Sequence, residues 1–473
     1  MKSTTVSTLA LLGGAAVAVH ACGTEREFAV VRRDAIQRRQ AAAARPTDEA
    51  GMAQVSDPTQ ECAMYSYPPV AALLAQKVYP PIWQIANLSS AQSTEATSLY
   101  NSLSASIPNI APKGTPTGNF TGVNYNGAQD PDCWWTWKQC HTPKAAGILP
   151  DIYNVPEPNT WGFTLDDGPN CTHNAFYDFM NQQKQKATLF YIGSNVIDWP
   201  LQAQRGLADG HEICAHTWSH RYMTSLSNEQ VFAELYYSKK AIKDVLGVTV
   251  QCWRPPYGDV DDRVRYIAQA LGMRTIIWSD NTFDYEVSTL GVNAVNQNYQ
   301  NIINSGKGGA YSSNGTIVLT HELNNDTMSL MMQNYAAIKQ AFKYVAPVHV
   351  ALNSTMPYVE TGYTYPNFAQ WTAGTTSISL ASPTAVSTDA SLSIPLSTGA
   401  TGSISASVAH SAASAGQAAA AATSSSSASA AAQTAPHSGA ERSVSGPGAS
   451  GPVGAVLAAV LGAVGAGAMA VMV

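Results

Sequence analysis

The 473-residue sequence contains little charge: Asp, Glu, Lys and Arg make up only 12% of it, against about a quarter in an average soluble protein. Acidic residues outnumber basic ones by 32 to 26, which gives a net charge of −6. Proteins that bind nucleic acid usually carry a basic excess, so this composition argues against a nucleic-acid partner. The hydrophobic fraction of 45% overstates the core, because alanine-rich, low-complexity sequence near the C-terminus contributes much of it.

Cysteine is also scarce, with seven in the whole chain. Cys22 lies beside a predicted signal-peptide cleavage site, which leaves Cys62, Cys133, Cys140, Cys171, Cys214 and Cys252. An even number in a secreted chain predicts disulfide bonds, and six cysteines allow fifteen pairings among which the sequence does not choose. The preferred single pair is Cys133 with Cys140, because it would close a short loop.

The two chain ends carry targeting patterns. A short apolar stretch after Lys2 predicts a signal peptide over residues 1–18, with a cut as late as residue 21. Residues 451–473 are apolar and uncharged, and small residues at Ser438-Gly439-Ala440 and a polar spacer precede them. This pattern predicts a GPI-anchor signal with Ser438 as the attachment candidate. A retained transmembrane helix is the alternative, but no basic flank follows the segment.

Two further segments are predicted to lack a core. Residues 22–60 contain two dibasic pairs and an alanine run, which favours a flexible leader, either a pro-segment removed by a protease or a plain disordered stretch. Residues 371–450 are mostly Ser, Ala and Thr, a composition that cannot bury a core and predicts an extended, O-glycosylated stalk.

Residues 61–154 are predicted to form an irregular arm, rich in Pro, Asn, Ser and Tyr. Trp134, Trp135 and Trp137 lie beside its predicted disulfide loop. Flat apolar rings suit the C–H faces of sugars, so a sugar-stacking platform is one interpretation. The other is that the rings pack the arm onto the main domain.

The segment 155–358 alternates apolar runs with helical patterns. Seven apolar runs predict strands, at residues 161–165, 187–192, 211–215, 250–253, 274–278, 316–319 and 348–352. The clearest helix begins at Ser227, with Gln230 as a capping-box partner, and ends at Gly247. This alternation predicts an α/β fold, either a (β/α) barrel or an open sheet, in which ligands bind at the C-terminal ends of the strands.

Two adjacent carboxylates, Asp166 and Asp167, come directly after the first apolar run. Such like charges repel each other unless a cation lies between them or one is protonated. His216 and His220 follow a later run, and they would share one face if the segment were helical. Imidazole suits zinc and related divalent metals, so Asp167, His216 and His220 could hold a catalytic ion with positions open for water and substrate.

Charged residues follow other strands as well. Arg254 could hold the Asp166 carboxylate and keep it ionised. His321 follows another run, apart from the metal pair, and is a candidate general acid. Asp280 and Asp284 supply carboxylates that could orient His321.

Together, and in this order, these motifs resemble the carbohydrate esterase family 4 polysaccharide deacetylases, the NodB homology domain, over about residues 155 to 355. The resemblance is strongest to secreted fungal chitin deacetylases with a GPI anchor. It implies a distorted (β/α) barrel of about seven strands and one divalent metal, zinc foremost, with cobalt or manganese as alternatives. It assigns metal binding to Asp167, His216 and His220, the base to Asp166, its tether to Arg254, an oxyanion-binding backbone N–H to Tyr257, the acid to His321, its orientation to Asp284 and the acetyl pocket to Leu319.

The implied reaction is hydrolysis of the N-acetyl groups of chitin to chitosan and acetate at the fungal cell wall. Chitin or chitosan, and a membrane reached through the GPI anchor, are the expected partners of a monomer. A preference for partly deacetylated chitosan, a catalytically weak chitin-binding wall protein and an esterase acting on acetylated xylan are the alternatives.

Three positions depart from the family pattern. Leu165 replaces a phenylalanine in the motif that contains Asp166 and Asp167. Asn281 and Tyr285 replace an aspartate and a tryptophan in the motif that contains Asp284. The last two put substrate preference in question. Six sequons are candidate N-glycosylation sites, at Asn87, Asn119, Asn170, Asn314, Asn325 and Asn353.

Overall fold

The computed structural model describes residues 45–374 and Ile378. The predicted signal peptide, the GPI-anchor signal with Ser438, and the stalk beyond α16 (Phe368–Ala373), apart from Ile378, lie outside the described residues. No helix within the described part is long and apolar enough to cross a membrane.

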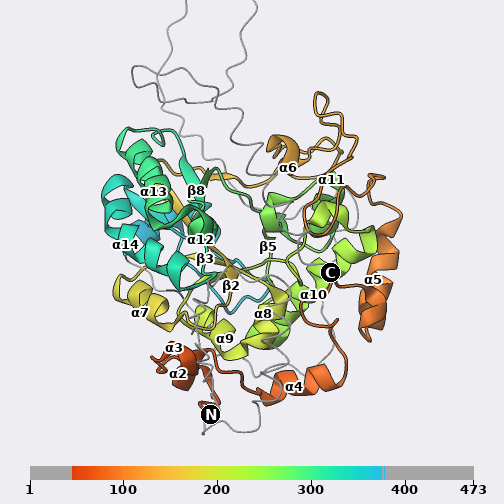
Figure 1. The fold of residues 1–473 in the computed structure, drawn as a ribbon, viewed down its shortest axis with the longest axis horizontal. Helices are drawn as coiled ribbons and strands as arrows, with labels where there is room; N and C mark the ends of the chain where they lie inside the picture. Colours follow the sequence, from red (N-terminus) through yellow and green to blue (C-terminus); the bar gives the residue numbers. More distant parts are fainter. Residues whose placement is uncertain (1–44, 375–377, 379–473) are drawn as a thin grey trace, which may run out of the picture. The chain divides into compact units, whose positions relative to one another are not determined.

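A curled, mostly parallel sheet organises the described chain (Figure 1). Its strands are β1 (Asn154–Val155), β2 (Thr160–Gly168), β3 (Thr188–Tyr191), β4 (Glu212–Ala215), β5 (Cys252–Trp253), β6 (Arg274–Thr275), β7 (Asp280–Asn281), β8 (Gly315–Leu319) and β9 (Tyr344–Ala346). Seven follow the order β1-β8-β2-β3-β4-β5-β6, while β7 pairs with β8 and β9 with β2. A parallel bridge between Ile152 and Ile276 links the two ends of this order. The predicted distorted barrel of about seven strands is therefore confirmed.

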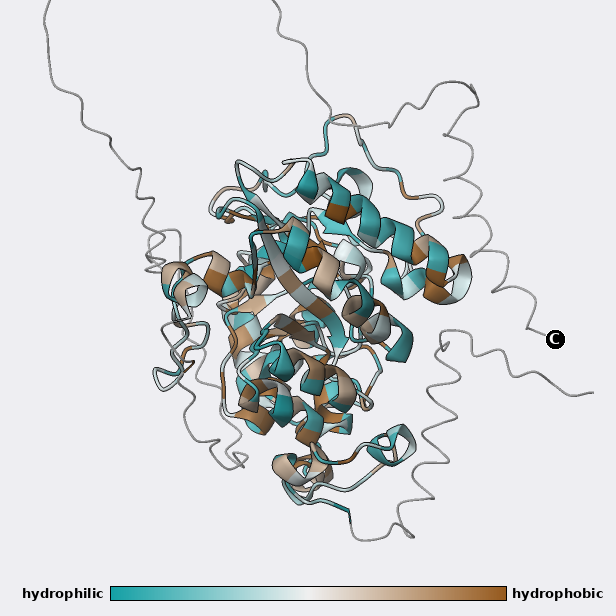
Figure 2. Cartoon of the chain, turned by 90° about the vertical axis from the view of Figure 1, so that its left-hand side faces the viewer, coloured by the Kyte–Doolittle hydropathy of each residue, from teal (hydrophilic) through white to brown (hydrophobic). Residues whose placement is uncertain are grey.

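Helices surround this sheet. They are α7 (Asn174–Gln182), α8 (Gly193–Asp198), α9 (Pro200–Ala208), α10 (Asn228–Leu246), α11 (Asp262–Ala270), α12 (Val287–Leu290), α13 (Val292–Lys307) and α14 (Asn325–Ala341). In Figure 2 hydrophobic colour concentrates on central strands and on stripes of the helices. The longest, α10, has the predicted capping box of Ser227 and Gln230, and Gly247 ends it at φ 80°.

Strand β2 is the centre of the sheet because it pairs with three strands, β3, β8 and β9, all in parallel. Its residues are buried on both faces, which is why its sequence shows a continuous apolar run rather than alternation. The carboxylates that follow this run are thereby held at one end of the sheet.

One of the seven strand predictions is wrong. The apolar run 348–352 contains a helical turn, α15 (Val348–Ala351), and the strand is β9, just before Pro347. All four α15 residues are buried. A short, fully buried apolar run has the same composition in a strand and in a helical turn, so periodicity does not separate them. Proline has no N–H for the ladder, which ends β9.

The predicted leader ends earlier than residue 60. Residues 45–60 contain α2 (Glu49–Met52) and the start of α3 (Pro58–Glu61), and Met52 is buried. Asn174 on α7 donates its side-chain amide to the carbonyls of Met52 and Val55. These contacts fix the segment against the barrel. They join residues far apart in the sequence, so the composition of the segment does not reveal them. The arm that follows contains α4 (Pro68–Ala75), α5 (Thr94–Ser104) and α6 (Trp135–Lys138).

Three disulfides link Cys62 to Cys171, Cys133 to Cys140 and Cys214 to Cys252. The predicted Cys133–Cys140 pair is confirmed. The first bond ties the start of the arm to the turn after β2, and the third joins the neighbouring strands β4 and β5.

We expect the first disulfide to stabilise the fold more than the second. Their sequence separations are 109 and 7 residues, and loop-closure entropy predicts losses of about 5 and about 2.5 kcal/mol respectively. Urea unfolding of the double variants Cys62→Ser/Cys171→Ser and Cys133→Ser/Cys140→Ser would measure both. A larger loss in the second variant would contradict this account.

Candidate active site

Asp166 and Asp167 close β2, and the backbone turns both carboxylates toward the same region. Neighbouring residues of a regular strand point to opposite faces. Here the register with β3 shifts between Asp166 and Gly168, and Asp167 has φ 71°. This irregularity, which sequence alternation cannot reveal, brings the two side chains together.

His216 and His220 come from the loop after β4, and this loop is not helical. The expected shared helical face is therefore replaced by another geometry: Thr217 and His220 have positive φ angles, 64° and 56°. The ring centroids of the two histidines lie 4.9 Å apart. Asp167 Oδ1 lies 3.4 Å from His216 Nε2 and 3.1 Å from His220 Nε2.

These three side chains have the chemistry of a divalent metal site. One donor atom from each lies within 4.8 Å of the others. Asp167 Oδ1 is buried with no hydrogen bond of acceptable geometry. His216 Nδ1 lies 2.8 Å from the Arg254 carbonyl and donates its proton there, so the Nε2 lone pair is available to an ion shared with Asp167. The donor set fits an ion such as zinc.

Arg254, which directly follows β5, holds the other carboxylate. Its Nη1 donates to Asp166 Oδ1 at 2.6 Å and to Thr164 Oγ1 at 2.9 Å. The guanidinium is fully buried and lies 4.1 Å from the centroid of the Phe190 ring. This charge-assisted hydrogen bond fixes the orientation of the Asp166 carboxylate.

His321 follows β8 and is held by Asp284 at two points. Its Nδ1 lies 2.6 Å from Asp284 Oδ1, and its backbone N–H donates to Oδ2 at 2.8 Å. Burial lowers the pKa of His321, but the Asp284 carboxylate and the nearby aspartates outweigh burial and raise the pKa to about 9. The imidazole is therefore protonated at neutral pH and can donate from Nε2.

Asp280, the second carboxylate considered for this role, is directed elsewhere. It accepts hydrogen bonds from Tyr311 and Thr316, whereas the carboxylate on His321 Nδ1 is that of Asp284. The prediction that it orients His321 is therefore wrong, because β7 pairs with β8 and directs Asp280 toward the Thr316 side chain.

Residues 281–285, which depart from the family pattern at Asn281 and Tyr285, still direct Asp284 toward His321. Asn281 Oδ1 accepts the N–H of Phe283 at 2.8 Å, a bond that an aspartate could also form. Phe283 adopts φ 54°, and Asp284 follows it in the orientation that reaches His321. The Tyr285 ring packs edge-on against His321 with centroids 5.2 Å apart. The substitutions therefore change the surface beside His321 more than its hydrogen bonding.

Tyr257 and Leu319 lie on two further sides. Tyr257 has φ 59° within η3 (Pro256–Gly258), and its ring, 47% exposed, lies 4.7 Å from that of His220. Left-handed backbone at a tyrosine is strained, and such residues concentrate at functional sites. Leu319 ends β8, two residues before His321, and is 4% exposed.

Sequence reasoning missed Glu322, which is fully buried behind the turn. It accepts a hydrogen bond from the Tyr177 hydroxyl at 2.9 Å, and burial raises its pKa to about 8. A side chain at Gly168 would collide with Glu322 Oε1, so the turn needs glycine for close approach. Gly168 was the one sequence signal that could have pointed to it.

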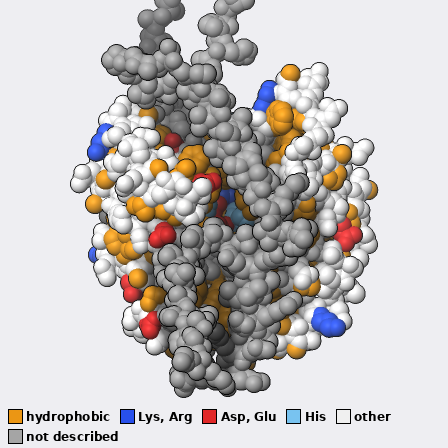
Figure 3. Space-filling model, viewed as in Figure 1, with side chains coloured by type: hydrophobic (Ala, Val, Ile, Leu, Met, Phe, Trp, Pro, Cys, Tyr) orange, Lys and Arg blue, Asp and Glu red, His pale blue; other side chains and the backbone are white. Residues whose placement is uncertain are grey.

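Figure 3 shows acidic and histidine side chains together in a hollow at the middle of one face of the molecule. The candidate residues thus converge from the ends of β2, β4, β5 and β8, where parallel strands place their functional groups. A buried acid–base pair and a candidate metal site meet there, an arrangement that can hydrolyse an acyl bond.

Comparisons with known proteins agree with this chemistry. A family model described as polysaccharide deacetylase matches residues 154–276. Chitin deacetylase 2 of Cryptococcus neoformans var. grubii is 50% identical over 390 residues, which cover 80% of this chain and 83% of that protein. Chitin deacetylase of Amylomyces rouxii is 47% identical over 322 residues, 67% of this chain and 75% of the relative. The chain therefore belongs to the polysaccharide deacetylase family.

Proposed function

We propose that this protein is a metal-dependent chitin deacetylase, which hydrolyses the N-acetyl groups of chitin to give chitosan and acetate. Relatives named chitin deacetylase, 47–50% identical to this chain, support the proposal. One observation carries it: the adjacent carboxylates Asp166 and Asp167 have different partners, an arginine and two histidines. Environments that separate two carboxylates in this way suit a base and a metal ligand.

Asp167, His216 and His220 would hold the ion, zinc foremost, with cobalt or manganese as alternatives. When bound, such an ion supplies Lewis-acid chemistry: it polarises the acetamide carbonyl and lowers the pKa of water. These residues leave coordination positions open, as a catalytic site requires.

The remaining residues would move the protons. Asp166, held by Arg254, accepts a proton from the water that attacks the acetamide carbon. The Tyr257 backbone N–H donates to the oxyanion that develops. His321, held by Asp284, then donates its proton to the amine nitrogen as the C–N bond breaks. Leu319 contributes an apolar surface for the acetyl methyl group.

The substrate could be a partly deacetylated chain rather than chitin itself, a second candidate favoured by the surface that Asn281 and Tyr285 present beside His321. A change in the side chains that line this surface changes which sugar units bind beside the reacting one. The protein would then extend deacetylation that another reaction begins.

We also propose secretion and attachment of a monomer to the outer face of the membrane by a GPI anchor at Ser438. The three disulfides support an oxidising, secreted setting. Four sequon asparagines are exposed and suit glycans: Asn119, Asn314, Asn325 and Asn353. Asn170 suits one least, since its side-chain amide donates to the Leu323 carbonyl at 2.6 Å.

We expect purified protein to release acetate from chitin oligomers and to lose this activity when a chelator removes the metal. Added zinc or cobalt should restore it, because the donor set fits such ions. An acetate assay with chitin oligomers, partly acetylated chitosan and acetylated xylan would test this. Release from xylan alone, or from none of them with zinc present, would overturn the proposal.

The Asp166→Asn and His216→Ala variants should lose activity for different reasons. Asp166→Asn removes the base and should lower kcat by about 10²- to 10⁴-fold while metal content stays at the level of the unmodified protein. His216→Ala should lose bound metal. Elemental analysis beside acetate release separates the two effects, and Asp326→Asn, at an exposed carboxylate, serves as the control. Normal turnover in either active-site variant would contradict the roles.

Activity should fall as pH rises through about 9, where protonated His321 loses its proton. Asp284→Asn removes the carboxylate that raises this pKa, so the alkaline limb of kcat/KM should move to lower pH. Asp280→Asn is the matched control, because Asp280 contacts Tyr311 and Thr316 instead. Rate profiles from pH 5 to 11 would decide; an unmoved limb in Asp284→Asn would rule out His321 as the acid.

A further inference from the structure

The three tryptophans at positions 134, 135 and 137 do not share one environment. Trp134 is fully buried, and its Nε1 donates to Asp259 at 2.9 Å. Trp135 packs edge-on against Trp278, with ring centroids 4.8 Å apart. These two pack the arm onto the barrel, as one of the two interpretations expected. Trp137 differs: it is 50% exposed.

Trp137 has one supported face. Its ring stacks on Trp134 with centroids 5.8 Å apart and an interplanar angle of 19°, and it meets Tyr125 at 5.8 Å. With half of its surface exposed, the ring offers solvent a flat apolar area. A tryptophan ring can bury a large apolar area against a ligand, so an exposed and supported ring is suited to binding one.

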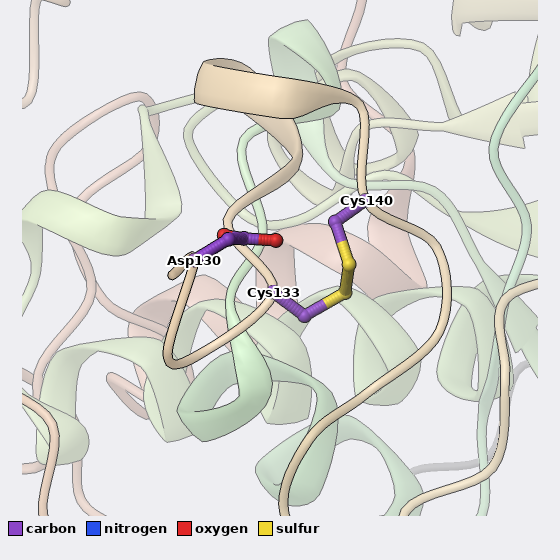
Figure 4. A group of neighbouring side chains, drawn as sticks. All are labelled: Asp130, Cys133 and Cys140. Carbon is purple, nitrogen blue, oxygen red and sulfur yellow. A yellow bond between two sulfur atoms is a disulfide. The ribbon is translucent and has the colours of Figure 1, made fainter. Parts of the chain in front are cut away.

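The loop that carries Trp137 is rigid. Figure 4 shows the bond between Cys133 and Cys140, which closes this loop beside Asp130. Asp130 accepts the Trp134 N–H at 3.0 Å and the Tyr125 hydroxyl at 2.5 Å. Because the disulfide occupies both sulfurs, Asp130, Cys133 and Cys140 do not form a metal site. The effect of the disulfide is to fix the position of the exposed ring before any ligand arrives.

A row of aromatic rings joins this loop to the candidate active site. From Trp134 it passes to Phe120 at 5.2 Å, to Tyr222 at 5.4 Å and to Tyr257 at 4.0 Å, whose ring lies 4.7 Å from His220. Tyr222 and Tyr257 are parallel within 5°. The arm supports this row directly, because Gly118 packs against the Tyr222 ring.

The surface beside the row is polar. Tyr125, which contacts Trp137, lines an open hollow of about 930 Å³ together with Asn124 and Asn126. Amide groups both donate and accept hydrogen bonds, as sugar hydroxyls require. In Figure 3 an apolar patch lies on the same face as the central hollow, where Figure 1 draws α6. Flat rings with amides beside them match a polysaccharide better than an apolar partner.

We propose that Trp137, Tyr222 and Tyr257 form a sugar-binding platform that holds units of the polysaccharide remote from the acetyl group being removed. The proposal rests on the function proposed above. Its outermost residue, Trp137 on α6, precedes the matched family segment, whereas Tyr222 and Tyr257 lie within it. The occupant is the same chain whose acetyl group lies at Asp166 and His321, because ring contacts through the buried Trp134 fix the position of the Trp137 loop relative to that site. Long substrates reach Trp137 and short ones do not.

The test compares a six-unit and a two-unit chitin oligomer with Trp137→Ala, a substitution at an exposed ring that leaves the buried Trp134 in place. KM for the six-unit oligomer should rise on the order of tenfold, while its kcat and both constants for the two-unit oligomer stay unchanged. Leu290→Ala, at another exposed apolar side chain, 49% exposed, is the control. An unchanged six-unit KM, or equal changes for both oligomers, would overturn the platform.

A binding measurement separates this proposal from the proposed function. Affinity for the six-unit oligomer is measured calorimetrically in Asp166→Asn and in Asp166→Asn/Trp137→Ala, in both of which we expect slow turnover because the base is removed. The second should bind on the order of tenfold more weakly. Equal affinities overturn the platform even where acetate release succeeds. A protein that binds through Trp137 but releases no acetate in any form retains the platform and loses the enzymatic proposal.

Discussion

The buried guanidinium of Arg254 is the constraint on which the site depends. A charge with no solvent contact must be fully paired, because an unpaired one costs several kcal/mol. Its partners are the Asp166 carboxylate, the Thr164 hydroxyl, and the carbonyls of Ile276 and Ile277. These groups come from β2, at the centre of the sheet, and from the residues that follow β6, at one end of the strand order, so pairing this one charge holds the two strands around it. The same residue's carbonyl sets the tautomer of His216.

This arrangement explains how two identical neighbours differ in chemistry. Asp166 faces a permanent positive charge, whereas Asp167 faces two imidazoles that can share an ion with it. Burial raises the pKa of Asp167, but the histidines outweigh it and hold the pKa well below its usual range. The division of labour follows from what each strand end presents across the barrel.

The sequence predicted which residues would meet, because parallel strands deliver their C-terminal ends to one place. It did not predict how they meet. The histidine loop is held by two left-handed residues instead of a helix, and nothing in the spacing of His216 and His220 distinguishes these cases. Residues 45–60 fold through tertiary contacts with Asn174, which composition cannot reveal. The strand prediction for residues 348–352 was wrong for a related reason: a segment buried on all sides has no alternation of apolar and polar residues to distinguish a strand from a helical turn.

The bridge between Ile152 and Ile276 gives the arm a role beyond carrying tryptophans. The matched family segment begins at residue 154, so the residue that closes the ring of strands lies just outside it. A chain cut at that boundary would keep every candidate catalytic side chain yet leave β6 as an open edge, whose unpaired N–H and C=O groups recruit other strands. The smallest soluble unit therefore extends upstream of the family segment. A fragment that begins at residue 154 would expose this edge and aggregate.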